Sequence, residues 1–329
     1  MVFLGDLTDE TYCKTGLGLV QWRRSDCLGQ IRLPGSQVDA GVPDMSIEQA
    51  VAAGASSLIV GTAAVGGGLP WHWIKTLINA AERGLDIVAG LHVRLASLPG
   101  LAEAAARGGA RLVDARVPPE GIPVGTGLKR SGRRLLTVGT DCACGKKYTA
   151  LAIDLELKRR GLASDFRATG QTGVMIAGSG LAIDAVVADF VTGAAEILSP
   201  AHSPDHWDII EGQGALFHPG YLQVTAGLLV GSQPDAFVVC HDPLRTHILG
   251  WPTFALPSIH DVIDRTVLLG QLTNPAIRCV GVALNTSKIN PGARIALLEK
   301  FAAETGLPCV DPLIDGVAAI VDRMMVEFP

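Results

Sequence analysis

The chain has 329 residues, enough for two domains, and its content of 48% hydrophobic against 18% charged residues excludes an intrinsically disordered protein. Lys and Arg number 27 against 32 Asp and Glu, and the formal charge of −5 argues against a general nucleic-acid-binding protein. The longest stretch without a charged side chain, 212–234, is interrupted by Gln, His, Pro and Gly, so we expect no membrane-spanning helix and no membrane partner.

In the N-terminal half, short apolar runs alternate with helical patterns. The runs predict strands at 57–63, 85–92 and 110–117. One helix is predicted to start at an N-cap, Ser46, and two more are predicted to close at Gly84 and Gly108. This alternation predicts a parallel sheet covered by helices. The three glycines at 66–68 could allow a ligand to approach the backbone, but they do not form the G-x-G-x-x-G pattern of NAD-binding proteins.

Proline and glycine gather between residues 118 and 127, which predicts a boundary near residue 125 between domains 1–125 and 126–329. The second half begins with a predicted strand at 133–140, a glycine-bounded turn and a helix that ends at Gly161. Further strands are predicted at 164–170, 206–214, 234–242 and 277–286. This order again indicates a doubly wound α/β domain.

The seven cysteines are an odd number, and no C-x-x-C pair occurs among them. Scattered thiols such as Cys240 and Cys279, on predicted strands, are typical of a protein in a reducing compartment. The first ten residues lack the basic segment and apolar core of a signal peptide. We therefore expect a cytoplasmic protein. Cys142 and Cys144 form a C-x-C without a second Cys/His pair, so we interpret them as loop residues and expect no metal.

The segment GTDCACGKKY follows a predicted strand and opens a helix, which is the context of a phosphate-binding loop. Glycines permit the tight turn, backbone N–H groups point into it, and the helix N-terminus favours an anion. A purely structural glycine turn is the alternative. The predicted cofactor-binding residues are Gly139, Thr140, Asp141, Cys142, Ala143, Cys144, Gly145, Lys146, Lys147 and Tyr148.

This loop resembles that of dethiobiotin synthetase and its relatives, which carry GTD, three residues and GK. DIIEGQG at 208–214 and GVALNT at 281–286 are similar to later segments of that superfamily. One position departs from the pattern, because Lys147 stands where a nucleotide hydrolase has the Ser or Thr that binds Mg²⁺. Thr149, two residues on, points elsewhere on a helix. Two lysines without a metal ligand favour the phosphates of coenzyme A over Mg-ATP.

A wider resemblance covers nearly the whole chain, through GTAAVGGGLP, DARVPP, ATGQTGVMIAGSG, IEGQGALFHPGY and GSQPDAFVVCHDPLR. On these motifs the chain is similar to the two-domain family that includes the D-glutamate N-acetyltransferases. The resemblance implies an α/β fold with an N-terminal Rossmann-like parallel-sheet domain and a C-terminal P-loop NTPase-like, doubly wound domain. It also implies transfer of an acetyl group from acetyl-CoA to the amine of a D-amino acid, D-glutamate in the first place. An ATP- or GTP-dependent ligase or kinase acting on a small carboxylate is the alternative enzyme, and a nucleotide-responsive sensor is the non-enzymatic one.

Acetyl transfer to an amine needs a base, donors for the developing oxyanion and an anchor for the acceptor's carboxylates. Glu211 is a candidate base; alternatively it orders the P-loop, partners a metal in a nucleotide enzyme, or is an exposed turn residue. His218, in a Gly/Pro-flanked loop, is expected to share the proton transfer unless it is structural, and His241 is the next candidate.

The candidate acceptor contacts follow three predicted strands, at 133–140, 164–170 and 234–242. Asp141 could lie near the substrate or cap a turn. Arg245 could bind a carboxylate bidentately or form an ordinary salt bridge. We expect a small-molecule substrate and assembly into a homo-oligomer. The predicted substrate-binding residues are Gln171, Thr172, Gly173, Ser179 and Arg245.

Overall fold

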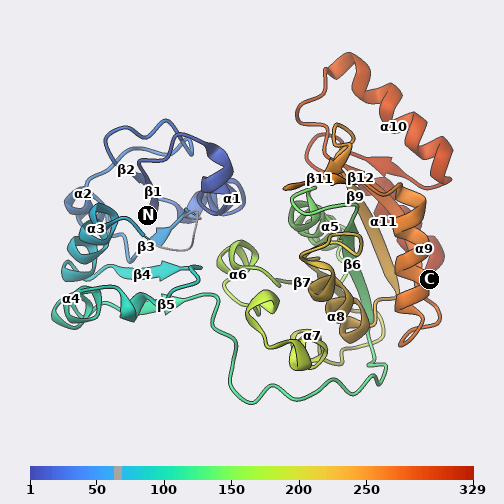
Figure 1. The fold of residues 1–329 in the computed structure, drawn as a ribbon, viewed down its shortest axis with the longest axis horizontal. Coiled ribbons are helices and arrows are strands. Elements are labelled where there is room, and N and C mark those ends of the chain that lie inside the picture. The colour runs from blue at the N-terminus through green and yellow to red at the C-terminus, as the bar shows by residue number, and fades with distance from the viewer. Residues whose placement is uncertain (63–68) are drawn as a thin grey trace. The chain divides into compact units, whose positions relative to one another are not determined.

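The computed structural model describes residues 1–62 and 69–329 (Figure 1). The predicted glycine loop at 66–68 lies outside the described residues. The chain forms two compact units, Met1–Val117 with Val174–Ala182, and Pro118–Gly173 with Ile183–Pro329. The division predicted near residue 125 did not include the excursion of 174–182 into the first unit, since nothing in the local sequence marks it.

The first unit is built on a parallel sheet with the strand order β2-β1-β3-β4-β5. The predicted strands at 57–63, 85–92 and 110–117 are confirmed as β3, β4 and β5, while β1 and β2 were not predicted. The elements are β1 (Val2–Gly5), α1 (Lys14–Trp22), β2 (Gln30–Arg32), α2 (Ile47–Ala52), β3 (Ser57–Val60), α3 (Trp71–Glu82), β4 (Asp86–Ala89), α4 (Leu101–Gly108) and β5 (Leu112–Asp114).

Helix ends in this unit follow the expected chemistry with one correction. Ser46 caps α2, and its side chain accepts a hydrogen bond from the Gln49 amide as predicted. Gly84 follows α3 with a φ of 83°. Gly108 is the last residue of α4 and not its C-cap, because the left-handed C-cap conformation is taken by Gly109, one residue later. A Cβ at position 108 would lie 1.9 Å from the Ala81 carbonyl oxygen, so glycine is needed there for the close approach of α4 to α3.

The second unit holds a parallel sheet with the order β13-β12-β9-β6-β8-β7. The predicted α/β fold with parallel sheets is confirmed in both units. The elements are β6 (Arg133–Gly139), α5 (Lys146–Arg159), β7 (Ser164–Arg167), α7 (Val191–Leu198), β8 (Trp207–Ile210), α8 (Leu222–Ser232), β9 (Ala236–His241), β10 (His247–Ile248), β11 (Trp251–Ala255), α9 (Ile259–Gly270), β12 (Arg278–Leu284), α10 (Pro291–Thr305), β13 (Cys309–Val310) and α11 (Ala318–Glu327). Helix α6 (Gln171–Ala177) begins in this unit.

Helices cover both faces of the second sheet, which explains why β9 buries apolar side chains on both of its faces. Alternate residues of β9, such as Val238 and Cys240, share one buried cluster with residues of α5 and α11. Phe237 and Val239 point the other way and are also fully buried, and α8 and α9 contact β6 and β9. Residues buried on both faces are the expected result of a parallel sheet between two helical layers.

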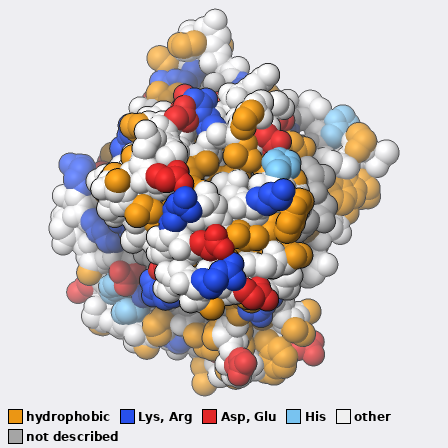
Figure 2. All heavy atoms as spheres, turned by 90° about the vertical axis from the view of Figure 1, so that its left-hand side faces the viewer, with side chains coloured by type: hydrophobic (Ala, Val, Ile, Leu, Met, Phe, Trp, Pro, Cys, Tyr) orange, Lys and Arg blue, Asp and Glu red, His pale blue; other side chains and the backbone are white. Residues whose placement is uncertain are grey.

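Acidic and basic side chains lie interspersed on the face of the molecule shown in Figure 2. Exposed ion pairs of the N-terminal unit include Arg111 with Asp86, 2.6 Å apart, and Arg83 with Glu48, 2.7 Å apart. Within the described ranges, none of the helices has the length and apolar character needed to cross a lipid bilayer.

Candidate functional site

Three neighbouring strands of the second unit deliver polar residues to one edge of the sheet. Gly139 ends β6, Glu211 directly follows β8, and His241 ends β9, while β8 and β9 pair with β6 on its two sides. Parallel strands present their carboxyl ends together, and ligands of open α/β sheets bind where the strand order reverses. The P-loop therefore lies at the centre of the site, between Glu211 and His241.

The P-loop leads into α5, whose N-cap is Gly145. The buried Lys146 reaches back across the loop, where its Nζ donates to the Asp141 carbonyl oxygen at 2.7 Å. Lys147 is half-buried, with its Nζ 4.5 Å from the centre of the Tyr148 ring. Thr149 donates its hydroxyl to the Gly145 carbonyl at 3.1 Å, as expected for a side chain turned away from the loop opening. The described loop thus offers ammonium groups where metal-dependent hydrolases offer a hydroxyl.

Asp141 is fully buried and serves the loop's own structure. Its Oδ1 accepts from the Cys142 amide at 2.6 Å, and its Oδ2 accepts from Arg245 and from the Leu249 amide at 2.9 and 2.8 Å. It does not cap α5. Arg245 also donates to the carbonyls of Cys142 and Ala143 and pairs with Asp242 at 3.1 Å. The guanidinium is thus committed to the P-loop rather than pointing away from it.

Glu211 is not the exposed turn residue of one interpretation, because only 3% of it is exposed. Its Oε2 accepts from the amides of Thr169 and Gly170 at 3.0 and 3.2 Å. A Cβ on Gly173 would lie 2.1 Å from this oxygen, so a glycine at the start of α6 makes room for the carboxylate. Burial raises the pKa of Glu211 to about 7, opposed by Lys147, the two amides and Lys146.

His218 is 1% exposed and lies between the rings of Tyr221 and Trp251, each 4.6 Å away between centroids. Its Nδ1 accepts from the Gly220 amide at 3.1 Å, which assigns the proton of the neutral ring to Nε2. Nε2 is buried, 3.9 Å from Asp141 Oδ1, without a hydrogen bond of ordinary geometry in the described structure. Burial lowers the pKa of His218, despite Asp141 and the Leu249 backbone. The ring is therefore a neutral donor at pH 7.

His241 has a different task. Its Nδ1 lies 3.0 Å from the Thr140 hydroxyl, and its ring packs edge-on against Phe301. Burial lowers the pKa of His241 to about 4, with Asp242 opposing the shift. The ring therefore stays neutral around pH 7 and joins β9 to the P-loop.

The predicted acceptor contacts fall in both compact units. Gln171, Thr172 and Gly173 form the first turn of α6, beside Glu211. Ser179 is exposed and lies in the segment 174–182 that belongs to the first unit. Tyr221 and Trp251, which flank His218, were missed, since Trp251 stands in the β10–β11 hairpin without any motif around it.

Three side chains of the site could in principle ligate a metal. Asp141, Cys142 and His218 each bring one ligand atom within 4.8 Å of the others. Cys144 turns inward instead, and its Sγ donates to the Asp141 carbonyl at 3.0 Å. Asp141 already pairs with Arg245, and His218 carries its proton on Nε2, so neither group is in the state needed to bind a cation.

Comparison with known proteins identifies the family. A domain described as "Domain of unknown function (DUF1611_C) P-loop domain" matches residues 123–321, and its "DUF1611_N" Rossmann-like counterpart matches 31–118. The chain belongs to the DUF1611 family. Two relatives, from Tritonibacter scottomollicae and a Pseudoalteromonas species, are both named D-glutamate N-acetyltransferase. Each is 44% identical to this chain over 324 residues, which is 98% of this chain. The aligned region covers 97% of the Tritonibacter protein and 98% of the Pseudoalteromonas protein. The crystal structure of a DUF1611 protein from Anabaena variabilis is similar with a TM-score of 0.88, at 34% identity, over 99% of both chains.

The raised pKa of Glu211 predicts a specific pH dependence of stability. The folded protein keeps a proton on this carboxyl that the unfolded chain loses from pH 4.5 upward, so stability falls as the pH rises through about 7. Between pH 5 and 8, the free energy of unfolding of the wild type should fall by about 2–3 kcal/mol relative to Glu211→Gln, which cannot titrate. Urea unfolding of both proteins at several pH values measures this difference. Parallel pH profiles would contradict the buried, titrating carboxyl.

Proposed function

We propose that this DUF1611 protein transfers the acetyl group of acetyl-CoA to the amine of D-glutamate. The observation that carries the proposal is the 44% identity, over 98% of the chain, to two relatives named D-glutamate N-acetyltransferase. The chemistry at the carboxyl edge of the second sheet supports it. That edge combines a phosphate-binding loop, a buried carboxyl that titrates near neutral pH and a buried N–H donor.

In this proposal the P-loop binds the phosphates of coenzyme A. The backbone amides at the start of α5, Lys146 and Lys147 supply positive charge, and an ammonium at position 147 in place of a hydroxyl favours an anion bound without Mg²⁺. Coenzyme A carries a pyrophosphate and a ribose phosphate, which suit two lysines in succession. A ligand phosphate would replace the contact that Lys146 makes with the Asp141 carbonyl.

Glu211 is the proposed general base. A D-amino acid arrives as an ammonium ion and must lose a proton before its nitrogen can attack the thioester carbon. A base works best when its pKa lies near the working pH, and burial raises the pKa of Glu211 to about 7. The carboxylate takes one proton from the ammonium and passes it to solvent. The second proton, which the attacking nitrogen loses as the amide forms, goes to the sulfur of the departing coenzyme A. Lys147 favours the charged form of Glu211 through space.

His218 receives a role other than the shared base expected from the sequence. Its Nδ1 is occupied by the Gly220 amide, and its Nε2–H lacks a well-formed hydrogen bond within the described residues. A buried donor without a well-formed hydrogen bond is costly, and an acceptor that develops during the reaction lowers that cost. We assign His218 to donate to the thioester oxygen as negative charge accumulates there.

The proposed activity is tested by mixing the purified full-length protein with acetyl-CoA and D-glutamate. Release of free thiol and formation of N-acetyl-D-glutamate should depend on the protein, and L-glutamate should react more slowly. Calorimetry should detect binding of coenzyme A in the presence of EDTA. Tight binding of Mg-ATP with none of coenzyme A, and no acetylated product, would favour the ligase or kinase instead.

Lys146→Ala removes one charge-assisted contact to phosphate, worth about 1.5–3 kcal/mol, so affinity for coenzyme A should fall by about 10- to 150-fold. The fold should survive, because the lysine sits at the start of α5 rather than in its apolar interface. Lys158→Ala, at the other end of the same helix and paired with Asp154, is the matched control and should bind normally. Equal affinity of the Lys146 and Lys158 variants would mean that the phosphates bind elsewhere.

The roles of Glu211 and His218 separate in a pH profile. In the wild type, kcat/KM should rise through about pH 7 as Glu211 ionises. Glu211→Gln should lower kcat by about 10²–10⁴ and remove this rise. His218→Ala should lower kcat by about 10²–10³ yet keep the rise, because a donor to the oxyanion does not titrate in this range. Loss of the rise in the His218 variant would make His218 the base.

A further inference from the structure

A second polar cluster lies at the opposite end of β7 and β8 from the P-loop. Asp165 and Asp208 are register partners on these adjacent parallel strands, and both stand one residue after the strand start. Asp208 is three residues before Glu211, which corresponds to about 10 Å along a strand. The cluster is therefore separate from the proposed acetyl-transfer site.

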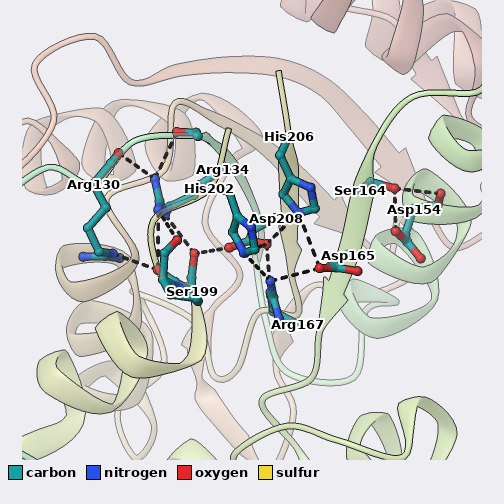
Figure 3. A network of polar contacts seen from close by, with 12 residues as sticks. Arg130, Arg134, Asp154, Ser164, Asp165, Arg167, Ser199, His202, His206 and Asp208 are labelled. Carbon is teal, nitrogen blue, oxygen red and sulfur yellow. Dashed lines mark hydrogen bonds and ion pairs between the residues drawn. The ribbon is translucent and has the colours of Figure 1, made fainter. Parts of the chain in front are cut away.

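The loop before β8 adds two histidines with H-x3-H spacing, His202 and His206. Their rings stack, with centroids 4.1 Å apart. The Nε2 of His206 lies 3.3 Å from Asp208 Oδ1 and 3.5 Å from Asp165 Oδ2, and the Nε2 of His202 lies 3.8 Å from Asp208 Oδ1. Figure 3 shows both imidazoles turned toward the two carboxylates. Two nitrogens and two oxygens thus lie within 4.8 Å of one another.

These separations match a tetrahedral metal site. With metal–ligand bonds of about 2.0–2.1 Å, neighbouring ligand atoms of a tetrahedron lie about 3.3–3.4 Å apart. An octahedral Mg²⁺ site with bonds of similar length would bring neighbours to about 2.9 Å. Three of the six separations, at 3.3, 3.5 and 3.8 Å, are nearer to the tetrahedral spacing than to the octahedral one. Imidazole nitrogen with carboxylate oxygen is a donor set that suits Zn²⁺.

One of the two histidines is in the state that a metal requires. Arg167 donates to the Nε2 of His202, so that nitrogen carries a lone pair. The Nε2 of His206 is buried and has no hydrogen-bond partner in the described part of the chain, although the carboxylates of Asp165 and Asp208 lie beside it. A metal ion would give this buried ring nitrogen the well-directed partner that it lacks in hydrogen bonding.

Asp208 also has the supporting contacts typical of a metal ligand. Its Oδ2 accepts from the Ser199 hydroxyl at 2.6 Å, and Ser199 in turn accepts from Arg134 at 2.8 Å. Arg134 is fixed by the carbonyls of 130–132, 199 and 200. These buried contacts orient the carboxylate and leave Oδ1 facing the histidines (Figure 3).

Arg167 occupies the cation's place in this structure. Its Nε donates to Asp208 Oδ1 at 2.8 Å, and its Nη2 lies 3.1 Å from Asp165 Oδ2 and 2.7 Å from His202 Nε2. The guanidinium thereby relieves the repulsion of two carboxylates on adjacent strands. The side chains of Arg167 and Asp165 are 21% and 48% exposed, so the cluster opens to solvent on this side. A metal ion could enter there as Arg167 swings out.

We propose that Asp165, His202, His206 and Asp208 form a tetrahedral binding site for Zn²⁺ that Arg167 holds closed in the metal-free protein. The bound ion would fasten the loop 199–206 to β7 and β8, far along the strand from Glu211. The site is independent of the proposed acetyl transfer, and its test uses binding rather than activity.

The test is calorimetric titration of Zn²⁺ into the full-length, EDTA-treated protein without an affinity tag. We expect one Zn²⁺ per chain, a visible absorption of tetrahedral type when Co²⁺ is used instead, and no binding of Mg²⁺. His202→Ala and His206→Ala should each lower the affinity by more than the 10- to 100-fold typical of losing an outer-shell contact. His260→Ala, whose imidazole contacts the Glu304 carbonyl on α10, is the control and should bind as the wild type does.

Arg167→Gln separates the metal site from a permanent ion-pair network. If Arg167 competes with the metal, this variant should bind Zn²⁺ more tightly than the wild type and gain more thermal stability from it. If the guanidinium is instead the permanent counter-charge, the wild type will not bind Zn²⁺ and the variant will only melt earlier. Unchanged Zn²⁺ binding in a His202→Ala/His206→Ala double variant would also overturn the proposal. So would Zn²⁺ binding by the Arg167→Gln variant when the wild type binds none.

Discussion

The cost of burying two carboxylates at one edge of a sheet shapes the whole candidate site. Asp141 and Glu211 are both removed from solvent at the carboxyl ends of β6 and β8, and a charge so placed must be matched by partners or give way to a proton. Asp141 has a guanidinium and two amides as partners. Glu211 has two amides and the more distant charge of two lysines.

This difference in compensation gives the two carboxylates different uses. The charge of Asp141 is matched by contacts that tie the P-loop to the segment 245–249, so it acts as a structural anchor. Glu211 is incompletely matched, and its pKa of about 7 lets it exchange a proton at neutral pH. Paired acids whose environments differ in this way commonly divide a reaction between a fixed charge and a proton carrier.

Strand β8 carries polar residues at both of its ends for separate purposes. Its amino end holds Asp208 among two imidazoles and a guanidinium, while its carboxyl end continues into Glu211. Between these two ends, Trp207 and Ile209 of β8 pack in one apolar cluster with residues of α5 and α11. A change that shifts β8 along the sheet would therefore alter both clusters, and the parallel register with β6 and β7 fixes their positions.

The sequence by itself determined the order of strands and helices around the P-loop, the lysine at position 147 and the resemblance to a two-domain acetyltransferase family. It did so because hydrophobic period, glycine turns and loop motifs act over a few neighbouring residues. Tertiary structure decided which groups meet: Arg245 reaches Asp141 across 104 positions, and Asp165 aligns with Asp208 only through strand pairing. It also set the tautomer of His218, which depends on the Gly220 amide. Side-chain partners are chosen by packing between distant segments, and no local pattern encodes that choice.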